Sequence, residues 1–353
     1  MDKKLKRAGF QEKDFHTGEV VLNYVVGPVR KGPPIIFIHG QSVTWEEYTF
    51  IMPMLSSDFT VYAVSLRGHG KSSWTPGQYT FNALGKDMTA FLSRIVREPA
   101  IVVGNSSGGV LTSWLAANAK PYVKAIVLED PPLFRCDQDN ITTTAVYDLW
   151  LAFSRATVPN GGGFAAFYRD FLVPTISKSE GVMGSEKRPP TSLLKMVGRL
   201  IVIQQMFHPG KPVDFGFMPA KPRIMIRGMS QFDGNFARAF VDGTVGQEFD
   251  HAETLSRIEV PVLFLHARYY MREDRLLGAL TDEDVERVRK LVRGPWRYVK
   301  MDCGHAIALD APEREEQEIR AWIAEQQWTA AQEKSDVAVG QHDQRAEGGS
   351  LHA

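Results

Sequence analysis

Short apolar runs alternate with segments of helical periodicity over most of the chain. In the segment 81–97, Phe81, Leu84, Met88 and Phe91 recur at spacings that give a helix one buried face. Continuous apolar runs are typical of strands buried on both faces of a parallel sheet. After an opening hairpin at 10–31, strands alternating with helices predict an α/β fold with a doubly wound, mostly parallel sheet. The predicted strands lie at 34–38, 60–64, 101–103, 124–128, 262–265 and 296–301.

The alternation stops between residues 135 and 258. This segment is helix-rich and irregular, and it carries more aromatic and methionine side chains than a connecting loop needs. We therefore expect a mainly helical lid inserted between the strands at 124–128 and 262–265. The predicted domains are an α/β core at 1–134 and 259–328, the lid at 135–258, and a polar, disordered tail at 329–353.

The composition argues against several classes of function. The 353 residues include 41 basic and 41 acidic ones, so no electrostatic attraction to nucleic acid or to a membrane surface is expected. No apolar run approaches the roughly 18 residues of a membrane span. Cys136 and Cys303 provide no disulfide framework, which predicts a cytoplasmic protein. No residues have the spacing of a metal site, and no cofactor is expected. The oligomeric state stays open.

A glycine-rich turn follows the apolar run at 101–103. It reads Gly104-Asn105-Ser106-Ser107-Gly108, and a helix-compatible segment begins directly after it. A serine that projects from a strained strand-to-helix turn needs nearly side-chain-free residues two positions before and after it. Gly104 and Gly108 meet this condition for Ser106. The free N–H groups at the start of the helix point toward an oxyanion beside the serine. The turn therefore predicts Ser106 as a nucleophile.

The adjacent Ser107 is an alternative nucleophile. At the apex of the turn it would have Asn105 and Gly109 as flanking residues, and the side chain of Asn105 would crowd the turn. We therefore assign the nucleophile to Ser106. The backbone N–H of Ser107 is then expected to be one donor of an oxyanion hole.

A serine hydroxyl needs a general base within hydrogen-bonding reach, and His305 is the best candidate. It lies in a loop directly after the strand at 296–301, so it reaches the same carboxyl edge of the sheet as the serine turn. The other histidines considered fit less well: His39 follows an earlier strand, His69 lies in a glycine turn, and His208 and His251 lie in the predicted lid.

Four motifs in this order resemble the α/β-hydrolase superfamily. They are His39-Gly40 after a strand, the Arg-Gly-His-Gly turn at 67–70, the serine turn, and Gly304-His305. The resemblance covers about residues 19–134 and 259–327 and implies the α/β-hydrolase fold. It also implies that the backbone N–H of Gln41 is the second donor of the oxyanion hole. Ser65 departs from the pattern, because many members carry Asp at that position.

The carboxylate that orients His305 has four candidates. The resemblance places it about four residues beyond the strand at 262–265, where this chain has Tyr270. Glu273 and Asp274 come three and four residues later and reach the histidine only through a rearranged loop. Some lactonase and esterase branches take the acid after the preceding strand, where Glu129 and Asp130 precede two prolines. A rigid mount suits an acid that holds the imidazole tautomer. We therefore expect Asp130, with Asp274, Glu273 and Glu129 as alternatives.

A serine nucleophile narrows the predicted chemistry. The dehalogenases and epoxide hydrolases of the superfamily use Asp at the turn, whereas serine indicates acyl transfer to water through an acyl-enzyme. The aromatic-rich lid predicts a fairly hydrophobic small-molecule substrate. We therefore expect a carboxylesterase or lactonase with a triad of Ser106, His305 and Asp130. The alternatives are a carbon–carbon bond hydrolase or perhydrolase with the same triad, and a non-catalytic ligand receptor on this fold.

Overall fold

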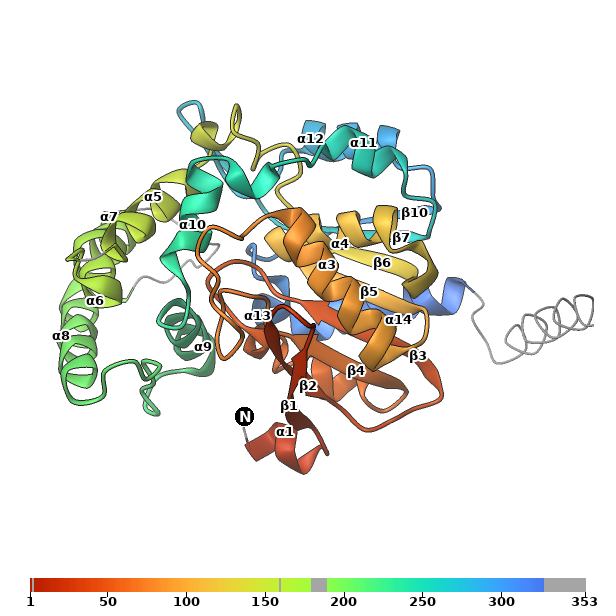
Figure 1. Cartoon of the computed structure of the whole chain (residues 1–353). Coiled ribbons are helices and arrows are strands. Elements are labelled where there is room, and N and C mark those ends of the chain that lie inside the picture. The colour runs from red at the N-terminus through yellow and green to blue at the C-terminus, as the bar shows by residue number, and fades with distance from the viewer. Residues whose placement is uncertain (2, 159, 179–188, 327–353) are drawn as a thin grey trace, which may run out of the picture.

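The computed structural model describes residues 1, 3–158, 160–178 and 189–326, and the tail predicted at 329–353 lies outside them. Within the described residues the predicted α/β fold is confirmed, with helices on both sides of an eight-stranded sheet (Figure 1). The hairpin and the later strands lie where the hydrophobic pattern places them. The strands run in the order β1 (Gln11–His16), β2 (Val21–Val26), β4 (Phe59–Val64), β3 (Gly32–Ile38), β5 (Ala100–Asn105), β6 (Val123–Glu129), β7 (Val262–His266) and β10 (Trp296–Lys300).

The winding of the sheet reverses at β3. The strand pairs β1–β2 and β2–β4 are antiparallel, whereas β3 is parallel both to β4 on one side and to β5 on the other. The strands from β5 to β10 continue in parallel, so their carboxyl ends share one edge with β3. Ligands of open α/β sheets bind at such a switch point. The loops after β3, β5 and β6 therefore meet where this topology favours a site.

The two faces of the sheet bury two separate sets of apolar side chains. In β3, Ile36 and Ile38 join the cluster that contains α3 (Phe81–Phe91), α4 (Ser107–Asn118) and α12 (Asp282–Leu291). The alternate residues Ile35 and Phe37 join the cluster on the opposite face. This period of two is what a strand covered on both faces requires. The opposite face is covered by α1 (Lys3–Arg7), η1 (Trp45–Tyr48), α2 (Met52–Leu55), α13 (Ile307–Asp310) and α14 (Pro312–Glu325).

The segment between β6 and β7, here called the insertion (residues 135–258), is helical in its described residues. The ring of Phe153 lies 4.7 Å from that of Phe167 and 5.0 Å from that of Phe232. These rings belong to the same apolar cluster as α3 and α4, so the insertion and the core are packed together. Its helices are η4 (Ile141–Thr143), α5 (Val146–Ala156), α6 (Gly163–Phe167), η5 (Tyr168–Leu172), α7 (Val173–Lys178), α8 (Thr191–Phe207), α9 (Ala220–Met229), α10 (Gly234–Val241), η6 (Thr244–Gly246) and α11 (His251–Ser256).

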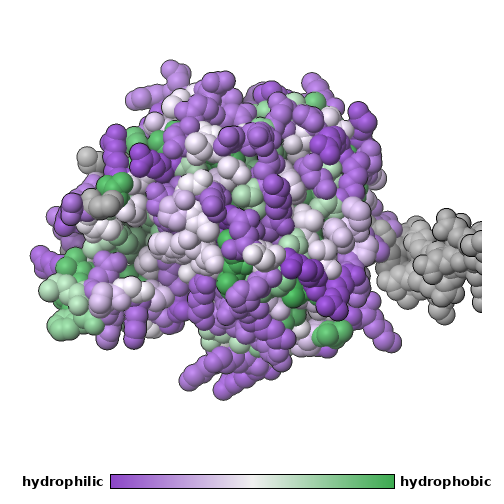
Figure 2. Space-filling model, in the orientation of Figure 1, coloured by the Kyte–Doolittle hydropathy of each residue, from purple (hydrophilic) through white to green (hydrophobic). Residues whose placement is uncertain are grey.

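The outer edge of the insertion is the most apolar part of the visible surface. Figure 2 shows apolar surface at the position that α8 occupies in Figure 1, while most of the same view is polar. Met206 and Phe207, at the end of α8, are 74% and 75% exposed. Among the residues that the structure describes, no helix combines the length and the apolar character needed to cross a bilayer.

One hairpin was not predicted from the sequence. β8 (Tyr270–Arg272) and β9 (Arg275–Leu277) pair in an antiparallel manner directly after β7, with Glu273 and Asp274 at the turn. The strand residues of β8 are exposed. A short exposed strand has no apolar alternation, so the period-two pattern that reveals buried strands is missing. The N-terminal helix α1, of five residues, was missed because it is also too short to show periodicity.

Candidate active site

Ser106 occupies the sharp turn between β5 and α4. Its backbone has φ 53° and ψ −123°, a conformation that costs a non-glycine residue about 1–3 kcal/mol. Hydrogen bonds fix this conformation: its N–H donates to the carbonyl of Glu129 at 2.9 Å, and its carbonyl accepts from Gly109 N–H at 2.9 Å. Ser107, the alternative nucleophile, is instead the first residue of α4 and is buried. The strained position that projects a side chain from the turn belongs to Ser106.

Three glycines allow the segments around Ser106 to approach closely. A methyl group on Gly104 would lie 2.4 Å from the carbonyl oxygen of Gly108, and one on Gly108 would lie 2.3 Å from that of Ile38. A methyl group on Gly40 would lie 3.1 Å from Cβ of Ser106. The loop after β3 therefore runs directly against the serine, which brings the following residue, Gln41, to the turn. N–H groups in the first turn of a helix have no acceptor within that helix, so Ser107 N–H is available to an oxyanion.

His305 and Asp130 are joined by a hydrogen bond. Nδ1 of His305 lies 2.7 Å from Oδ2 of Asp130, although the residues are 175 positions apart in the chain. Asp130 has φ 45°, a left-handed conformation that Asp tolerates better than most residues. Its N–H donates to the carbonyl of Leu265 at 2.8 Å, and its Oδ1 accepts from Ala267 N–H at 3.3 Å. The acid is therefore anchored to the end of β7 as well as β6.

The His305 loop is also tied to the serine turn. The amide Nδ2 of Asn105, the residue before Ser106, donates to the carbonyl of His305 at 2.9 Å. From the sequence, Asn105 was considered only as a side chain that could crowd the turn. The structure instead makes it a link between the ends of β5 and β10. Asparagine at this position gives no signal of that role, because its partner lies 200 residues away.

The three alternative acids lie elsewhere. Glu273 and Asp274 are exposed at the β8–β9 turn. Glu129 is fully buried at the end of β6, where its carboxylate accepts from the hydroxyl of Tyr48 at 3.4 Å. Successive residues of a strand point to opposite sides of the sheet, which separates Glu129 from the following residue. Of the four candidates, Asp130 is the one hydrogen-bonded to the imidazole.

The electrostatics of His305 suit a general base. Burial opposes the charged imidazolium, but the hydrogen bond and the negative charge of Asp130 outweigh it and raise the pKa of His305 above its ordinary value. The His305 side chain keeps 30% of its surface exposed, while that of Asp130 keeps 2%. A buried carboxylate thus holds one ring nitrogen, and the other is left to face a reacting group.

Three carboxyl groups are buried behind the site. Burial, and to a lesser extent Glu129, raise the pKa of Glu47 to about 8, while a hydrogen bond from Gly40 N–H at 3.0 Å lowers it. Burial likewise raises the pKa of Glu315 to about 8 and that of Glu129 well above its usual range. The neighbouring carboxyl group of Glu315 raises the pKa of Glu129 further. These groups are therefore neutral over most of the physiological range.

Two buried histidines support the loop after β3. Nε2 of His39 accepts from Leu66 N–H at 3.0 Å, so its Nδ1 donates to the carbonyl of Gly40 at 2.6 Å. Nε2 of His69 accepts from Ser42 N–H at 3.3 Å. Burial lowers the pKa of His39 to about 4 and that of His69 well below its ordinary value. Both rings are thus neutral, and they act as fixed hydrogen-bonding groups of the two glycine motifs rather than as bases.

The carboxamide of Gln41 has no hydrogen-bond partner among the described residues. Its Oε1 and Nε2 atoms are both buried, and the residue is 8% exposed. A buried polar group without a partner costs about 1–3 kcal/mol. Gln41 follows Gly40, which lies against Ser106. The unpartnered carboxamide therefore belongs to the loop that runs beside the serine turn.

The site contains no metal-binding arrangement that the described residues reveal. Within them, no group of three or more His, Cys, Asp or Glu side chains could hold a metal ion. Cys136 and Cys303 are buried free thiols, and burial raises the pKa of Cys303 to about 11. At neutral pH such a thiol is protonated and unreactive.

Comparisons with known proteins agree with this architecture. A model of the alpha/beta hydrolase family matches residues 35–317. Bifunctional epoxide hydrolase 2 of Sus scrofa is 29% identical over 314 residues, covering 83% of this chain and 51% of that protein. Fluoroacetate dehalogenase of a Burkholderia species is 30% identical over 127 residues, covering 35% of this chain and 41% of that protein. The chain thus spans about half the length, or less, of these relatives.

Solved structures show the same fold. The chain is similar to an enol-lactonase from Burkholderia xenovorans LB400, with a TM-score of 0.61 and 16% identity, over 88% of this chain and 100% of that one. It is also similar to E-2-(acetamidomethylene)succinate hydrolase, with a TM-score of 0.56 and 20% identity, over 89% of this chain and 99% of that one.

Replacing Asp130 tests its role as the orienting acid. Asn tolerates the left-handed backbone, so Asp130→Asn is expected to fold while kcat for hydrolysis falls about 10³- to 10⁴-fold. Loss of the Asp130 charge lowers the pKa of His305. The residual activity should therefore begin to rise at a lower pH than the activity of the wild type. The measurement is kcat/KM against pH. The matched control Asp274→Asn should retain wild-type activity, and the opposite ranking of the two variants would refute the assignment.

Replacing Glu315 tests the buried carboxyl cluster. Its pKa is about 8 when folded and about 4.5 when exposed, so its contribution to stability is complete below pH 4.5 and is lost as the pH rises through 8. Glu315→Gln, which stays neutral, is expected to flatten this decline by about 1–3 kcal/mol between pH 5 and 9. Denaturant unfolding at several pH values measures it. The exposed residue Glu313 on the same helix provides the control Glu313→Gln, whose pH dependence should match the wild type.

Proposed function

Because the chain belongs to the alpha/beta hydrolase family, we propose that it is a serine hydrolase that cleaves a carboxylic ester or lactone. The observation that carries this proposal is the hydrogen bond between His305 and Asp130, at the sheet edge where Ser106 occupies the strained turn. A nucleophile, a base and an orienting acid are the parts that acyl transfer needs. The family membership supports hydrolysis, and the side chains support this bond type.

The proposed reaction uses an acyl-enzyme. Oγ of Ser106 attacks the carbonyl carbon while His305 takes its proton, and the tetrahedral oxyanion is held by the N–H groups of Gln41 and Ser107. His305 then gives the proton to the leaving alcohol. Water, activated by the same imidazole, hydrolyses the acyl-serine and regenerates the hydroxyl. Asp130 keeps Nδ1 of His305 protonated throughout, and no cofactor is required.

The serine distinguishes this reaction from those in the names of the relatives. Opening an epoxide or displacing a halide at saturated carbon with a serine alkoxide would leave an ether on the enzyme. An ether is not hydrolysed by a general base and water, so the enzyme would be inactivated after one turnover. An acyl-serine, by contrast, is an ester that the same base and oxyanion hole can hydrolyse. The nucleophile therefore favours acyl transfer over alkyl transfer.

Two features support a hydrophobic substrate that also carries a hydrogen-bonding group. The insertion, which we propose to act as a lid, is rich in aromatic rings such as Phe153, Phe167 and Phe232. Apolar walls with a few polar groups are typical of small-molecule sites. The unpartnered carboxamide of Gln41 gains a partner if a hydroxyl or carbonyl group of the substrate lies near the scissile ester. We therefore propose hydrophobic esters or lactones with such a neighbouring group.

Substitution of the nucleophile is the direct test. Ser106→Ala is expected to reduce hydrolysis of p-nitrophenyl esters and of hydrophobic lactones at least about 10³-fold, because the covalent step is removed. The matched control is Ser113→Ala, a buried serine within α4 whose hydroxyl donates to the Gly109 carbonyl at 3.2 Å. Its activity should stay near the wild-type value.

The outcome also separates the alternative functions. Turnover of esters that survives in Ser106→Ala would overturn the serine mechanism. Preferential turnover of a vinylogous diketone would indicate carbon–carbon hydrolysis, and hydrogen peroxide acting as acyl acceptor would indicate perhydrolysis. Tight ligand binding without multiple turnover would indicate a receptor.

A further inference from the structure

The insertion helix α9 lies between the two loops that supply the proposed catalytic groups. One loop, here called the oxyanion loop (residues 39–44), follows β3 and contains Gln41. The other contains His305 and leads into α13. Figure 1 shows α9 beside α13; one end of α9 contacts the oxyanion loop, and the other end contacts α13 directly after the His305 loop. Because α9 is part of the insertion, its contacts connect that segment with the site.

Gly228 brings the end of α9 against the backbone of the oxyanion loop. A methyl group on Gly228 would lie 2.7 Å from the carbonyl oxygen of Ser42 and 2.7 Å from Cα of Val43. Both neighbours are backbone atoms, which cannot move aside without shifting the loop. Ser42 has φ 62°, a left-handed conformation that a serine holds only under constraint.

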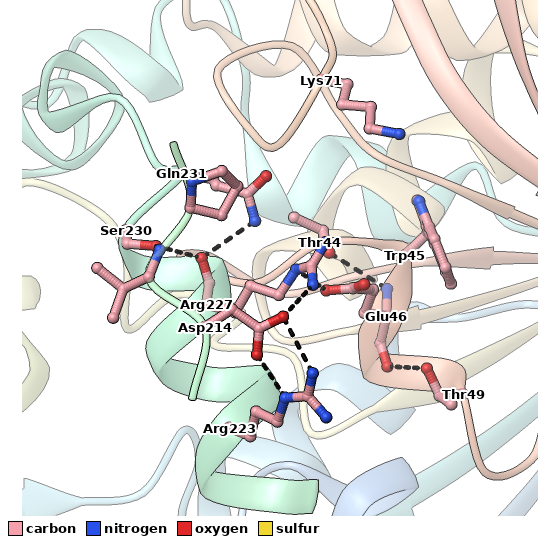
Figure 3. A network of polar contacts seen from close by, with 12 residues as sticks. Thr44, Trp45, Glu46, Thr49, Lys71, Asp214, Arg223, Arg227, Ser230 and Gln231 are labelled. Atoms are coloured by element: carbon pink, nitrogen blue, oxygen red, sulfur yellow. Dashed lines mark hydrogen bonds and ion pairs between the residues drawn. The ribbon is translucent and has the colours of Figure 1, made fainter. Parts of the chain in front are cut away.

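A polar network secures the same end of α9. The Arg227 guanidinium lies 3.1 Å from the Glu46 carboxylate on η1, directly after the oxyanion loop. It also lies 2.8 Å from Asp214, which in turn bonds Arg223 at 2.5 Å (Figure 3). The Glu46 side chain is 14% exposed and that of Arg227 27% exposed. Ion pairs with this degree of burial are screened less by solvent than exposed ones.

The segment after α9 holds the loop from a third direction. The rings of Phe232 and Phe236 lie 4.8 Å and 4.6 Å from that of His69. His69 is the residue whose Nε2 accepts from Ser42 N–H. Gly70 N–H donates to the carbonyl of Gln231 at 2.8 Å, which fixes the insertion to the glycine turn. The N–H of Ser42 is thus held through the His69 ring, which Phe232 and Phe236 contact. The carbonyl oxygen of Ser42 lies against Gly228.

The opposite end of α9 is paired with α13, the short helix that follows the His305 loop. Lys221, in the first turn of α9, forms an ion pair with Asp310 at the end of α13. The helix α13 begins at Ile307, two residues after His305. The Asp310 side chain is 10% exposed. A single helix of ten residues therefore connects the segment that supplies the proposed base with the segment that supplies one proposed oxyanion donor.

We propose that α9 and the segment up to Phe236 position the oxyanion loop, so that the insertion is part of the catalytic apparatus as well as a cover. This inference rests on the proposed function. Gly228 and Arg227 act here as positioning residues, because Gly228 touches the loop and Arg227 touches η1 directly after it, and neither touches the reacting atoms. Displacement of α9 should weaken stabilisation of the oxyanion in the transition state more than binding of the substrate in the ground state.

The test compares Gly228→Ala with Gly198→Ala. A methyl group on Gly198, in α8, would lie 3.3 Å from a carbon of the Tyr168 ring, a contact that a small side-chain shift relieves. For Gly228→Ala, kcat on a p-nitrophenyl ester should fall about 10²-fold, because a displacement of about 1 Å costs that much. KM should change less than about threefold. The inhibition constant of a trifluoromethyl ketone, which forms a tetrahedral oxyanion on serine, should rise in parallel, while Gly198→Ala matches the wild type in each measurement.

A second readout does not depend on turnover. Hydrogen–deuterium exchange of peptides covering residues 39–48 should be at least about tenfold faster in Gly228→Ala than in Gly198→Ala, at equal melting temperatures. Unchanged exchange together with unchanged inhibitor binding would overturn the inference. A wild-type protein that hydrolyses no ester would instead refute the proposed function, and the exchange measurement would still decide whether α9 holds the loop. A loss of activity matched by an equal loss of folded protein would also count against a positioning role.

Discussion

The close approach of α4 to the end of β3 is the constraint on which the site depends. Next to the turn of Ser106, the backbone of Gly108 lies against the carbonyl oxygen of Ile38, where a methyl group would be 2.3 Å away. The loop after β3 in turn lies against Cβ of the serine, where a methyl group on Gly40 would be 3.1 Å away. Glycines in this region are therefore required by contact between backbones. The strain at Ser106 is maintained by hydrogen bonds from two neighbouring segments, β6 and α4.

Beneath this edge, burial favours the neutral form of five ionisable groups. His39 and His69 are uncharged because they are buried, and Glu47, Glu129 and Glu315 hold their protons for the same reason. Asp130 differs from these groups in its contacts: its carboxyl group bonds His305 and Ala267 N–H, and its own N–H donates to the Leu265 carbonyl. A charge that develops on His305 during acyl transfer would then face one oriented carboxylate. The neutral surroundings limit competing interactions.

The insertion is joined to the core by more than apolar packing. Its aromatic rings belong to the same cluster as α3 and α4, and α9 adds backbone contacts and ion pairs at the two catalytic loops. The side chains proposed to cover a substrate and the backbone proposed to support an oxyanion donor thus lie on consecutive parts of one segment. This arrangement explains why α9 has a glycine at its contact point although glycine disfavours a helix interior by about 1 kcal/mol.

Local sequence was enough to predict most of the elements and to propose two members of the site, Ser106 and His305. The alternation of apolar runs with helical periodicity predicted a doubly wound sheet, and the spacing of Gly104 and Gly108 favoured Ser106 over Ser107. Both signals act over a few residues. Tertiary structure decided the rest. Asp130 was one of four candidate carboxylates until the fold brought it to His305, 175 residues away in the chain. The roles of Asn105, Glu47 and His69, and the contact of Gly228 with Ser42, depend on partners distant in the chain, and no local pattern of residues encodes such contacts.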